Sequence, residues 1–459
     1  MTDCLTQYYR CPEHYIRFAP KGQLSEPSGY FRFGSDTVYG RCCGINLSKS
    51  PSEPLYDGAL DTTSSDGMTY LPFDLQQVVD SLRYEKYAIT SADGSSAIRS
   101  PLNHLYYFIR PLLPVGVRKH LQKVHLSGWE RMPFPHWPVD CTVDNLLEHL
   151  MLLSLRSAGV HKIPFIWFWP EGAPSCAIMT HDVETRVGRD FCTTLMDIDD
   201  SFGIPACFQV VPEVRYEVTS TYLKSITDRG FGVGVQDLNH DGRLYRERAQ
   251  FIARAAKINS YGREWGAEGF RAAVLYRRQE WFDALDFAYD MSVPNVAHLD
   301  PQHGGCCTVM PYFVGKLLEL PVTTTQDYPL FHILNDYSIS LWKRQIDLIM
   351  GKHGLMSFIV HPDYIINSRE QNVYRALLAH LAHLRQQKSV WIAKADEVNR
   401  WWRQRAAMVI VEDGDRLRIE GEGRERARIA YASEQDGRLI LTIEAEAGDQ
   451  ALAAMLRSQ

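Results

Sequence analysis

The sequence predicts an α/β fold in which parallel strands alternate with helices. Two observations predict it. From about residue 163, short apolar runs alternate with longer stretches of helical periodicity. The runs are hydrophobic at nearly every position, which is typical of parallel strands buried on both faces. The strand-like runs are 164–169, 176–180, 206–211, 231–235 and 355–360, and clear helical stretches are 189–203 and 247–262.

The chain has 459 residues, which is more than one hydrophobic core usually organises, so we expect more than one domain. Changes in pattern divide it into an N-terminal α+β accessory region at 1–162, the α/β domain at 163–404 and a small β-rich domain at 405–459. The expected fold class is therefore α/β with an α+β region before the main domain and an antiparallel β appendage after it.

The N-terminal region is expected to combine short strands with helices. Strand-like segments lie at 29–34 and 36–40, and a helix is expected from Asp74, an N-capping residue, to about residue 87. A second helix opens near Asp144 and stops at Gly159.

A basic segment at 117–126 has two interpretations. It places Arg118, Lys119 and Lys123 on an otherwise apolar helix. Such a helix suits peripheral contact with anionic lipid or phosphate, but a basic face exposed to solvent is the favoured interpretation.

The β-rich end of the chain carries two hairpin signatures. Strands of period 2 flank the turns Asp413–Gly414 and Asp436–Gly437. An Asp-Gly turn between such strands predicts an antiparallel β-hairpin, so two hairpins are expected after residue 405.

Composition excludes several classes of function. A formal net charge of −6 gives no reason to expect nucleic acid as a partner. No apolar run reaches the roughly 18 residues of a membrane span, and the first residues lack a secretory signal pattern, so we expect a cytoplasmic protein. Ten cysteines without a Cys-x-x-Cys motif are expected to be reduced thiols and not a zinc ribbon. The oligomeric state is not predicted.

Two carboxylates directly follow the strand-like run 176–180. Asp182 and Glu184 are two residues apart, so on extended chain they point to the same side. Like charges held close together are costly unless a cation or a proton compensates them. The pair therefore indicates a metal site or a site of proton transfer, and the alternative is a solvated acidic loop. In parallel α/β folds, active residues gather at the carboxyl ends of the strands.

Later strand-like runs end in polar segments too. These are "VQDLNH" with Gln236 and His240, "GFRAAVLY" with Arg271, "YDMS" with Asp290 and "FIVHPDY" with His361. In this order, roughly residues 174 to 400 resemble the polysaccharide deacetylase (NodB-homology) superfamily, carbohydrate esterase family 4, in its His-Asp-Val-Asp branch. The resemblance implies a distorted (β/α) barrel of the glycoside hydrolase/deacetylase type.

The resemblance also implies a divalent metal, commonly zinc, held by one carboxylate and two histidines. Glu184 matches the metal carboxylate, lengthened from the usual Asp, and His240 matches the second histidine. Gln236 stands where the first histidine is expected. An amide oxygen is a poor zinc ligand, so the expected metal site is degenerate, and His181, Asp182 or Asp237 is a candidate to fill the gap.

The remaining matches imply catalytic roles. Asp182 matches the general base, Arg271 the arginine that orients it, and His361 the general acid, while Asp290 matches the family's Tyr-Asp-x-Ser segment. Such a site suits the removal of an N-acetyl group from an amino-sugar glycan or glycan precursor, because a metal polarises the carbonyl and a histidine protonates the leaving amine.

Three interpretations remain open. The first is a metal-dependent deacetylase-like hydrolase acting on carbon–nitrogen bonds. The second is a metal-poor pseudoenzyme that binds a carbohydrate in the same pocket, and the third is unrelated chemistry at the same rim. A cytoplasmic location favours a lipid-linked or nucleotide-linked sugar as the substrate.

Two further segments contain polar residues without a clear role. Residues 297–313 include His298, Asp300, His303 and two cysteines, which suggest either a second metal group or a tight Gly-Gly turn. Asp327 and His332 are expected near the barrel rim, and no role is assigned to them.

Overall fold

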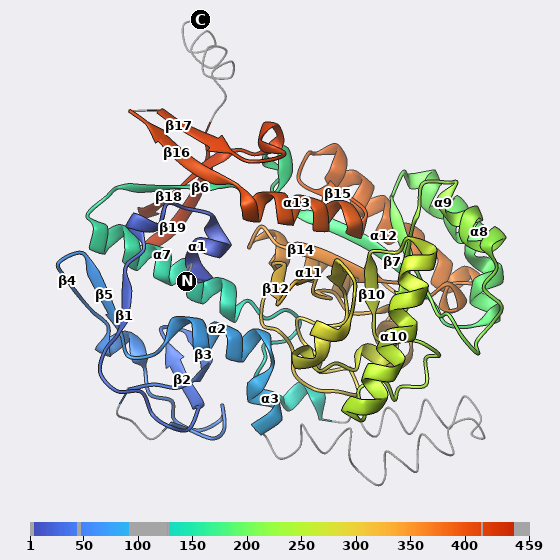
Figure 1. Ribbon diagram of the computed structural model, residues 1–459, viewed down its shortest axis with the longest axis horizontal. Helices are drawn as coiled ribbons and strands as arrows, with labels where there is room; N and C mark the ends of the chain where they lie inside the picture. The colour runs from blue at the N-terminus through green and yellow to red at the C-terminus, as the bar shows by residue number, and fades with distance from the viewer. Residues whose placement is uncertain (1–3, 44–46, 91–125, 127, 415, 445–459) are drawn as a thin grey trace, which may run out of the picture.

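The computed structural model describes residues 4–43, 47–90, 126, 128–414 and 416–444 (Figure 1). The basic segment at 117–126 lies outside the described residues except for its last one. None of the helices in the described ranges combines the length and apolarity that a membrane crossing requires.

A nine-stranded sheet forms the centre of the fold, with the order β12-β13-β11-β10-β9-β8-β7-β14 and with β15 also paired to β7. All neighbours are parallel except β12 and β13. The strands are β7 (Cys176–Val183), β8 (Ala206–Val210), β9 (Gly232–Gln236), β10 (Gly269–Arg271), β11 (Tyr289–Asp290), β12 (Tyr312–Val314), β13 (Leu317–Glu319), β14 (Leu355–Ile359) and β15 (Trp391–Ile392). The predicted α/β fold is confirmed.

The sheet curls into a half-barrel that side chains help to close. No ladder joins β13 to β14 among the described residues, but the chain after β13 runs beside β14. There the Thr323 hydroxyl donates to the Leu355 carbonyl at 2.7 Å and accepts from the Ser357 N–H at 2.9 Å, and the Thr324 hydroxyl donates to the Ser357 carbonyl at 2.7 Å. Threonine hydroxyls therefore replace part of a β ladder and keep the two edges together.

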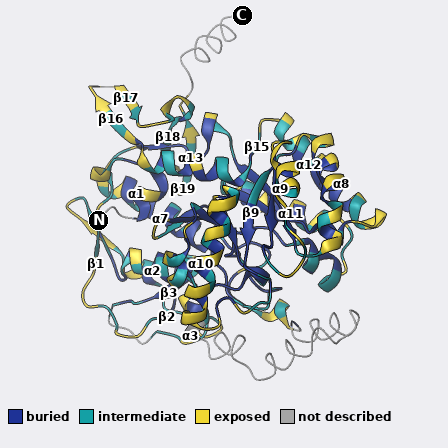
Figure 2. Ribbon diagram, turned by 45° about the vertical axis from the view of Figure 1, so that its right-hand side comes forward, coloured by how far each residue is buried: buried dark blue, intermediate teal, exposed yellow. Residues whose placement is uncertain are grey.

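Helices cover the sheet, and Figure 2 shows its buried strands behind helices with exposed outer faces. They are α8 (Arg186–Phe202), α9 (Ser220–Thr227), α10 (Arg248–Trp265), α11 (Ser340–Met350), α12 (Ser368–Gln386) and α13 (Ala395–Ala407). Helix α8 begins two residues after Glu184. The residue between them, Thr185, caps the helix, because its side chain accepts from the Gly188 N–H. This cap fixes the backbone next to Glu184.

The N-terminal region contains the predicted hairpin, β2 (Gly29–Phe33) and β3 (Asp36–Gly40). It also contains the predicted helices: Asp74 caps α2 (Leu75–Arg83), and α7 (Thr142–Ala158) ends at Gly159 in the left-handed conformation. The other elements are α1 (Cys4–Tyr9), β1 (Phe18–Pro20), β4 (Thr63–Ser65), β5 (Met68–Leu71) and α3 (Lys86–Thr90).

For one predicted strand, the sheet to which it was assigned is wrong. The run 164–169 was expected among the parallel strands, but β6 (Lys162–Ile166) pairs antiparallel with β18 (Ile429–Gln435), which pairs in turn with β19 (Arg438–Ile443). A continuous apolar run reports burial and does not report the direction of its partner. The hairpins at Asp413–Gly414 and Asp436–Gly437 are confirmed, the first joining β16 (Val409–Asp413) to β17 (Arg416–Glu420).

A buried arginine ties these separate segments together. The Arg405 guanidinium, on α13, donates to the carbonyl oxygens of Tyr8, Tyr9, Ile166 and Trp167. Helix α1, the strand β6 and the last helix of the α/β domain therefore share one polar contact, although they are far apart in sequence. The division of the chain into domains at residues 162 and 404 stays a prediction.

Candidate active site

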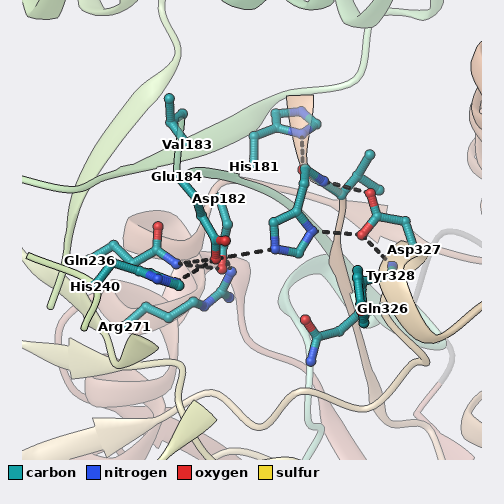
Figure 3. A network of polar contacts seen from close by, with 12 residues as sticks. His181, Asp182, Val183, Glu184, Gln236, His240, Arg271, Gln326, Asp327 and Tyr328 are labelled. Carbon is teal, nitrogen blue, oxygen red and sulfur yellow. Dashed lines mark hydrogen bonds and ion pairs between the residues drawn. The ribbon is translucent and has the colours of Figure 1, made fainter. Parts of the chain in front are cut away.

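The polar side chains predicted for the site lie at the carboxyl edge of the parallel sheet. They are Asp182 near the end of β7, Glu184 just after it, Gln236 at the end of β9, His240 in the following loop, Arg271 at the end of β10 and His361 just after β14. Except for Asp290, the predicted site residues thus come together in one network (Figure 3). Parallel strands explain the convergence, since their carboxyl ends meet at one edge.

Asp182 is bound by an arginine that is fully buried. The Arg271 guanidinium donates through Nη1 to Asp182 Oδ1 at 2.5 Å and to the Thr180 hydroxyl at 2.8 Å, and its Nε donates to the Met291 carbonyl at 3.1 Å. The contact balances the Asp182 charge, and the bonds to Thr180 and Met291 fix the direction of the guanidinium. Arg271 therefore has the position that the resemblance implies for it.

Glu184 lies between two histidines. Its Oε1 is 2.7 Å from His240 Nε2 and 3.4 Å from His361 Nε2, and its side chain is 19% exposed, so solvent reaches this point. Burial alone would raise the pKa of Glu184, but the two imidazoles outweigh it and hold the pKa well below its ordinary value. Glu184 is therefore a carboxylate at neutral pH.

His361 is held by a carboxylate to which the sequence assigned no role. Asp327 Oδ1 lies 2.7 Å from His361 Nδ1, and its Oδ2 accepts from the His361 N–H at 2.7 Å. Burial lowers the pKa of His361, but the carboxylates of Asp327 and Glu184 more than compensate and raise it well above its ordinary value. His361 is therefore an imidazolium at neutral pH, which suits a general acid.

Gln236 uses its amide nitrogen, and not its oxygen, to face the carboxylates. Its Nε2 donates to Asp182 Oδ2 and to Glu184 Oε1, both at 3.1 Å (Figure 3). Its Oε1 is buried and has no hydrogen-bond partner among the described residues. Two carboxylates on one side impose this orientation, because an amide oxygen there would be repelled. A neutral donor thus occupies the position between the two acids.

His240 carries a second contact on its far nitrogen. The Arg215 guanidinium lies 3.3 Å from His240 Nδ1 and donates to the His240 carbonyl at 2.5 Å. Burial lowers the pKa of His240, but the Glu184 carboxylate raises it to above its ordinary value. His240 Nε2 lies 2.7 Å from Glu184 Oε1, but outside hydrogen-bond geometry.

The metal set implied by the resemblance does not fit this arrangement. A zinc ion needs lone pairs from its ligands, whereas Gln236 presents an N–H group to Asp182 and to Glu184. In the described part of the chain, one group of acidic and histidine side chains comes close enough to share a cation, with ligand atoms of Asp182, Glu184 and His361 within 4.8 Å of one another. Because the fit to the implied set fails, no catalytic step is derived through a metal.

Asp290 lies outside the network around Glu184. It accepts from the Ser292 N–H at 2.9 Å and from the Ser292 hydroxyl at 2.8 Å. Burial raises the pKa of Asp290, and burial together with the neighbouring Asp290 raises that of Glu319 well above its ordinary value. The two acids are register partners on the neighbouring strands β11 and β13.

Two other predicted groups are also placed. His181 faces away from Glu184, with Nε2 2.9 Å from Asp199 Oδ2 and Nδ1 3.1 Å from the Val360 carbonyl, so it does not fill the gap in the metal set. In the segment 297–313, Gly304 and Gly305 have φ angles of 129° and 140°, but no turn is assigned at these two residues. Its His and Cys side chains form no second metal group in the described ranges.

The sequence is similar to no known family profile and to no curated protein at a significant level. Solved structures that align with it include a protein from Mycobacterium smegmatis assigned as a polysaccharide deacetylase (17% identity, 55% of this chain and 98% of the other, TM-score 0.42). Others are an allantoinase (13%, 51% and 92%, 0.40) and a family 4 acetyl xylan esterase from Clostridium thermocellum in complex with a cobalt ion (12%, 50% and 91%, 0.31). At these TM-scores the likeness carries no functional argument, and the function follows from the site itself.

Proposed function

We propose that this chain is a deacetylase-like hydrolase that removes an N-acyl group, such as acetyl, from an amino-sugar glycan or glycan precursor. One observation carries the proposal. A base held by an arginine, Asp182 with Arg271, and an acid held by a carboxylate, His361 with Asp327, converge on the solvent-accessible Glu184. Amide hydrolysis needs such a pair, because water must lose a proton and the amine must gain one.

The two groups have distinct tasks. Asp182 accepts the proton of the attacking water, while its contact with Arg271 balances the charge it starts with. His361 is an imidazolium and donates its Nε2 proton to the leaving nitrogen, since an amine is a poor leaving group unless it is protonated. The resemblance implies a divalent metal, commonly zinc, which would polarise the acyl carbonyl when bound, but the residues at the implied ligand positions do not fit it here.

Aromatic side chains beside the acid favour a sugar as the substrate. The ring of Tyr364 lies 4.8 Å from His361, and the rings of Tyr328 and His332 each lie 5.4 Å from Tyr364, with all three half-buried at the mouth of the site. Aromatic faces pack against the apolar faces of sugar rings. A lipid-linked or nucleotide-linked amino sugar is the substrate class that we propose.

A second candidate function is binding of the same carbohydrate without hydrolysis. The amide of Gln236 favours this candidate. Its nitrogen donates to the carboxylates of both Asp182 and Glu184, so a hydrogen-bond donor stands between them in place of a cation. A pocket with a hydrogen-bond donor in place of a metal ion can still hold a sugar. It polarises the carbonyl of a bound substrate much less strongly.

Release of acetate from N-acetylglucosamine oligomers and from a nucleotide-linked N-acetylamino sugar tests the proposal. The wild type should release acetate, and Asp182→Asn and His361→Gln should each lose about 10²- to 10⁴-fold in kcat. Asp190→Asn, which removes an exposed carboxylate on α8, is the matched control and should keep full activity. Calorimetric binding of either probe without any acetate release would instead support the second candidate.

A further inference from the structure

We infer that Gln236 and Arg215 together keep the metal position formed by Glu184, Gln236 and His240 closed to a metal ion. This inference concerns the same site but does not depend on the hydrolysis proposed above. It goes beyond the replacement of one histidine ligand, because it assigns the exposed Arg215 a part in excluding the metal.

The first step concerns the amide of Gln236. Its nitrogen makes two hydrogen bonds of 3.1 Å, one to Asp182 Oδ2 and one to Glu184 Oε1. A metal at this position needs the amide oxygen, so the amide must turn by half a rotation and give up both bonds. Hydrogen bonds to charged groups are stronger than those between neutral groups, so this rearrangement opposes metal binding.

The second step concerns the proton on His240. An arginine side chain has N–H donors and no acceptor, and it keeps its charge in proteins. The guanidinium of Arg215 therefore requires the lone pair of His240 Nδ1, which lies 3.3 Å away. The ring proton is then on Nε2, the nitrogen that faces Glu184 at 2.7 Å. A metal-binding histidine has the opposite arrangement, with its far N–H donated to an acceptor.

The backbone supports this arrangement of His240. The Arg215 side chain also donates to the carbonyls of Asn239 at 3.2 Å and of His240 at 2.5 Å, and His240 itself has a φ of 54°. Three contacts thus hold the guanidinium against one loop. Restoring a histidine at residue 236 leaves all three in place, so that substitution alone does not rebuild the zinc site.

Calorimetric titration of chelator-treated protein with Zn²⁺, together with Co²⁺ absorption, tests the inference without using activity. The variants are Arg215→Ala, Gln236→His and both combined, and Arg229→Ala is the control, since it removes a surface guanidinium bound to Asp197 and Asp200. We expect the double variant to bind one ion, and Gln236→His alone to bind at least tenfold more weakly. The wild type and Arg229→Ala should show no binding that depends on His240.

Two results would overturn the inference: equal affinities of Gln236→His and the double variant, or wild-type binding that His240→Ala abolishes. Wild-type binding that His361→Ala abolishes and His240→Ala leaves intact would support it, because the ion would then use the group of Asp182, Glu184 and His361. Near-UV circular dichroism checks folding, and Arg215→Gln replaces Arg215→Ala if the alanine variant unfolds. Acetate release is measured separately, so failure of the proposed hydrolysis leaves this result interpretable.

Discussion

The carboxylate of Asp327 contacts both the ring and the backbone of His361. Oδ1 lies 2.7 Å from the ring Nδ1, and Oδ2 accepts from the main-chain N–H at 2.7 Å. A side chain held at two points has little freedom to rotate, so the Nε2 of His361 keeps its direction toward Glu184. Asp327 is fully buried and acts through His361, which makes it a positioning residue.

Replacing Asp327 should alter the pH dependence of the reaction. In Asp327→Asn the main-chain bond can persist, but the negative charge that raises the pKa of His361 is lost. The high-pH limb of the kcat profile should move to lower pH, and kcat at neutral pH should fall by about tenfold or more. Acetate release measured from pH 5 to 10 checks this, with the exposed Asp283→Asn as the control. An unchanged limb would show that Asp327 does not tune the acid.

The contacts of Glu184 should also give stability a pH optimum. The pKa of Glu184 is lowered in the fold, so its contribution is present above its ordinary value of 4.5 and is lost as pH falls through the lowered value. The pKa of His361 is raised, so its contribution is present below its ordinary value of 6.5 and is lost as pH rises through the raised value. Between pH 4.5 and pH 6.5, Glu184 and His361 therefore both make their full contribution to stability.

Urea unfolding of the wild type and of Glu184→Gln between pH 4 and 9 measures this effect. The difference in free energy of unfolding should be largest between about pH 5 and 6.5 and should shrink toward alkaline pH. Glu53→Gln, at an exposed position, controls for the loss of a carboxylate and should show no such maximum. A difference that is constant over the whole range would contradict the assigned pKa shifts.

The sequence identified the parallel sheet and the main site because both leave local patterns. Continuous apolar runs marked the buried strands, and polar residues directly after them marked the carboxyl edge, as with Asp182 and Glu184. Asp327 follows the same rule, since it ends the segment "VTTTQD" beside β14. Its segment contacts β14 through threonine hydroxyls and not through a ladder.

Other contacts depended on long-range geometry that no local pattern encodes. The partner of β6 is more than two hundred and fifty residues away, in β18. The bond from Arg215 to His240 joins two loops after neighbouring strands, and an exposed arginine in a loop is usually solvated. The orientation of the Gln236 amide follows from which atoms face it, so the residue type alone predicted a possible ligand where the structure has a donor.

A buried ion pair connects the N-terminal region to the barrel. The Arg277 Nε donates to Glu85 Oε2 at 2.7 Å, and Glu85 Oε1 also accepts from the Gly305 N–H at 2.6 Å. Glu85→Gln should keep the bond to Gly305 but leave the buried Arg277 charge unpaired, which costs about 3–5 kcal/mol of unfolding free energy. The sequence alone gave no indication of this pair.

A double-mutant cycle separates the pair from its surroundings. Glu85→Gln combined with Arg277→Met removes the unpaired charge, so the double variant should be less destabilised than the sum of the single variants, by roughly 0.5–3 kcal/mol. Urea unfolding provides the values, and Glu434→Gln, which breaks the surface pair with Arg156, should change them little. Additive single effects would mean that the pair contributes no coupling.

Gly232 begins β9, the strand that ends at Gln236, and packs against the neighbouring strand. A Cβ at Gly232 would lie 2.5 Å from the Cys207 Sγ, a separation at which the Cys207 side chain or one of the two strands must shift. Gly232→Ala should therefore destabilise the protein by about 1–3 kcal/mol through overpacking. It should also displace the end of β9 and weaken binding of the sugar probe, because Gln236 lies four residues further along the same strand.

Removing the sulfur tests the cause of this effect. In Gly232→Ala combined with Cys207→Ala, the new methyl group occupies the space that the thiol leaves, so both stability and probe binding should largely recover. Gly351→Ala is the matched control, since its φ is −61° and the nearest atoms to an added Cβ are 3.4 Å away. That variant should be neutral or slightly more stable, by up to about 1 kcal/mol. If Gly232→Ala is as harmless as Gly351→Ala, then β9 tolerates a side chain there and its contact with Cys207 does not position Gln236.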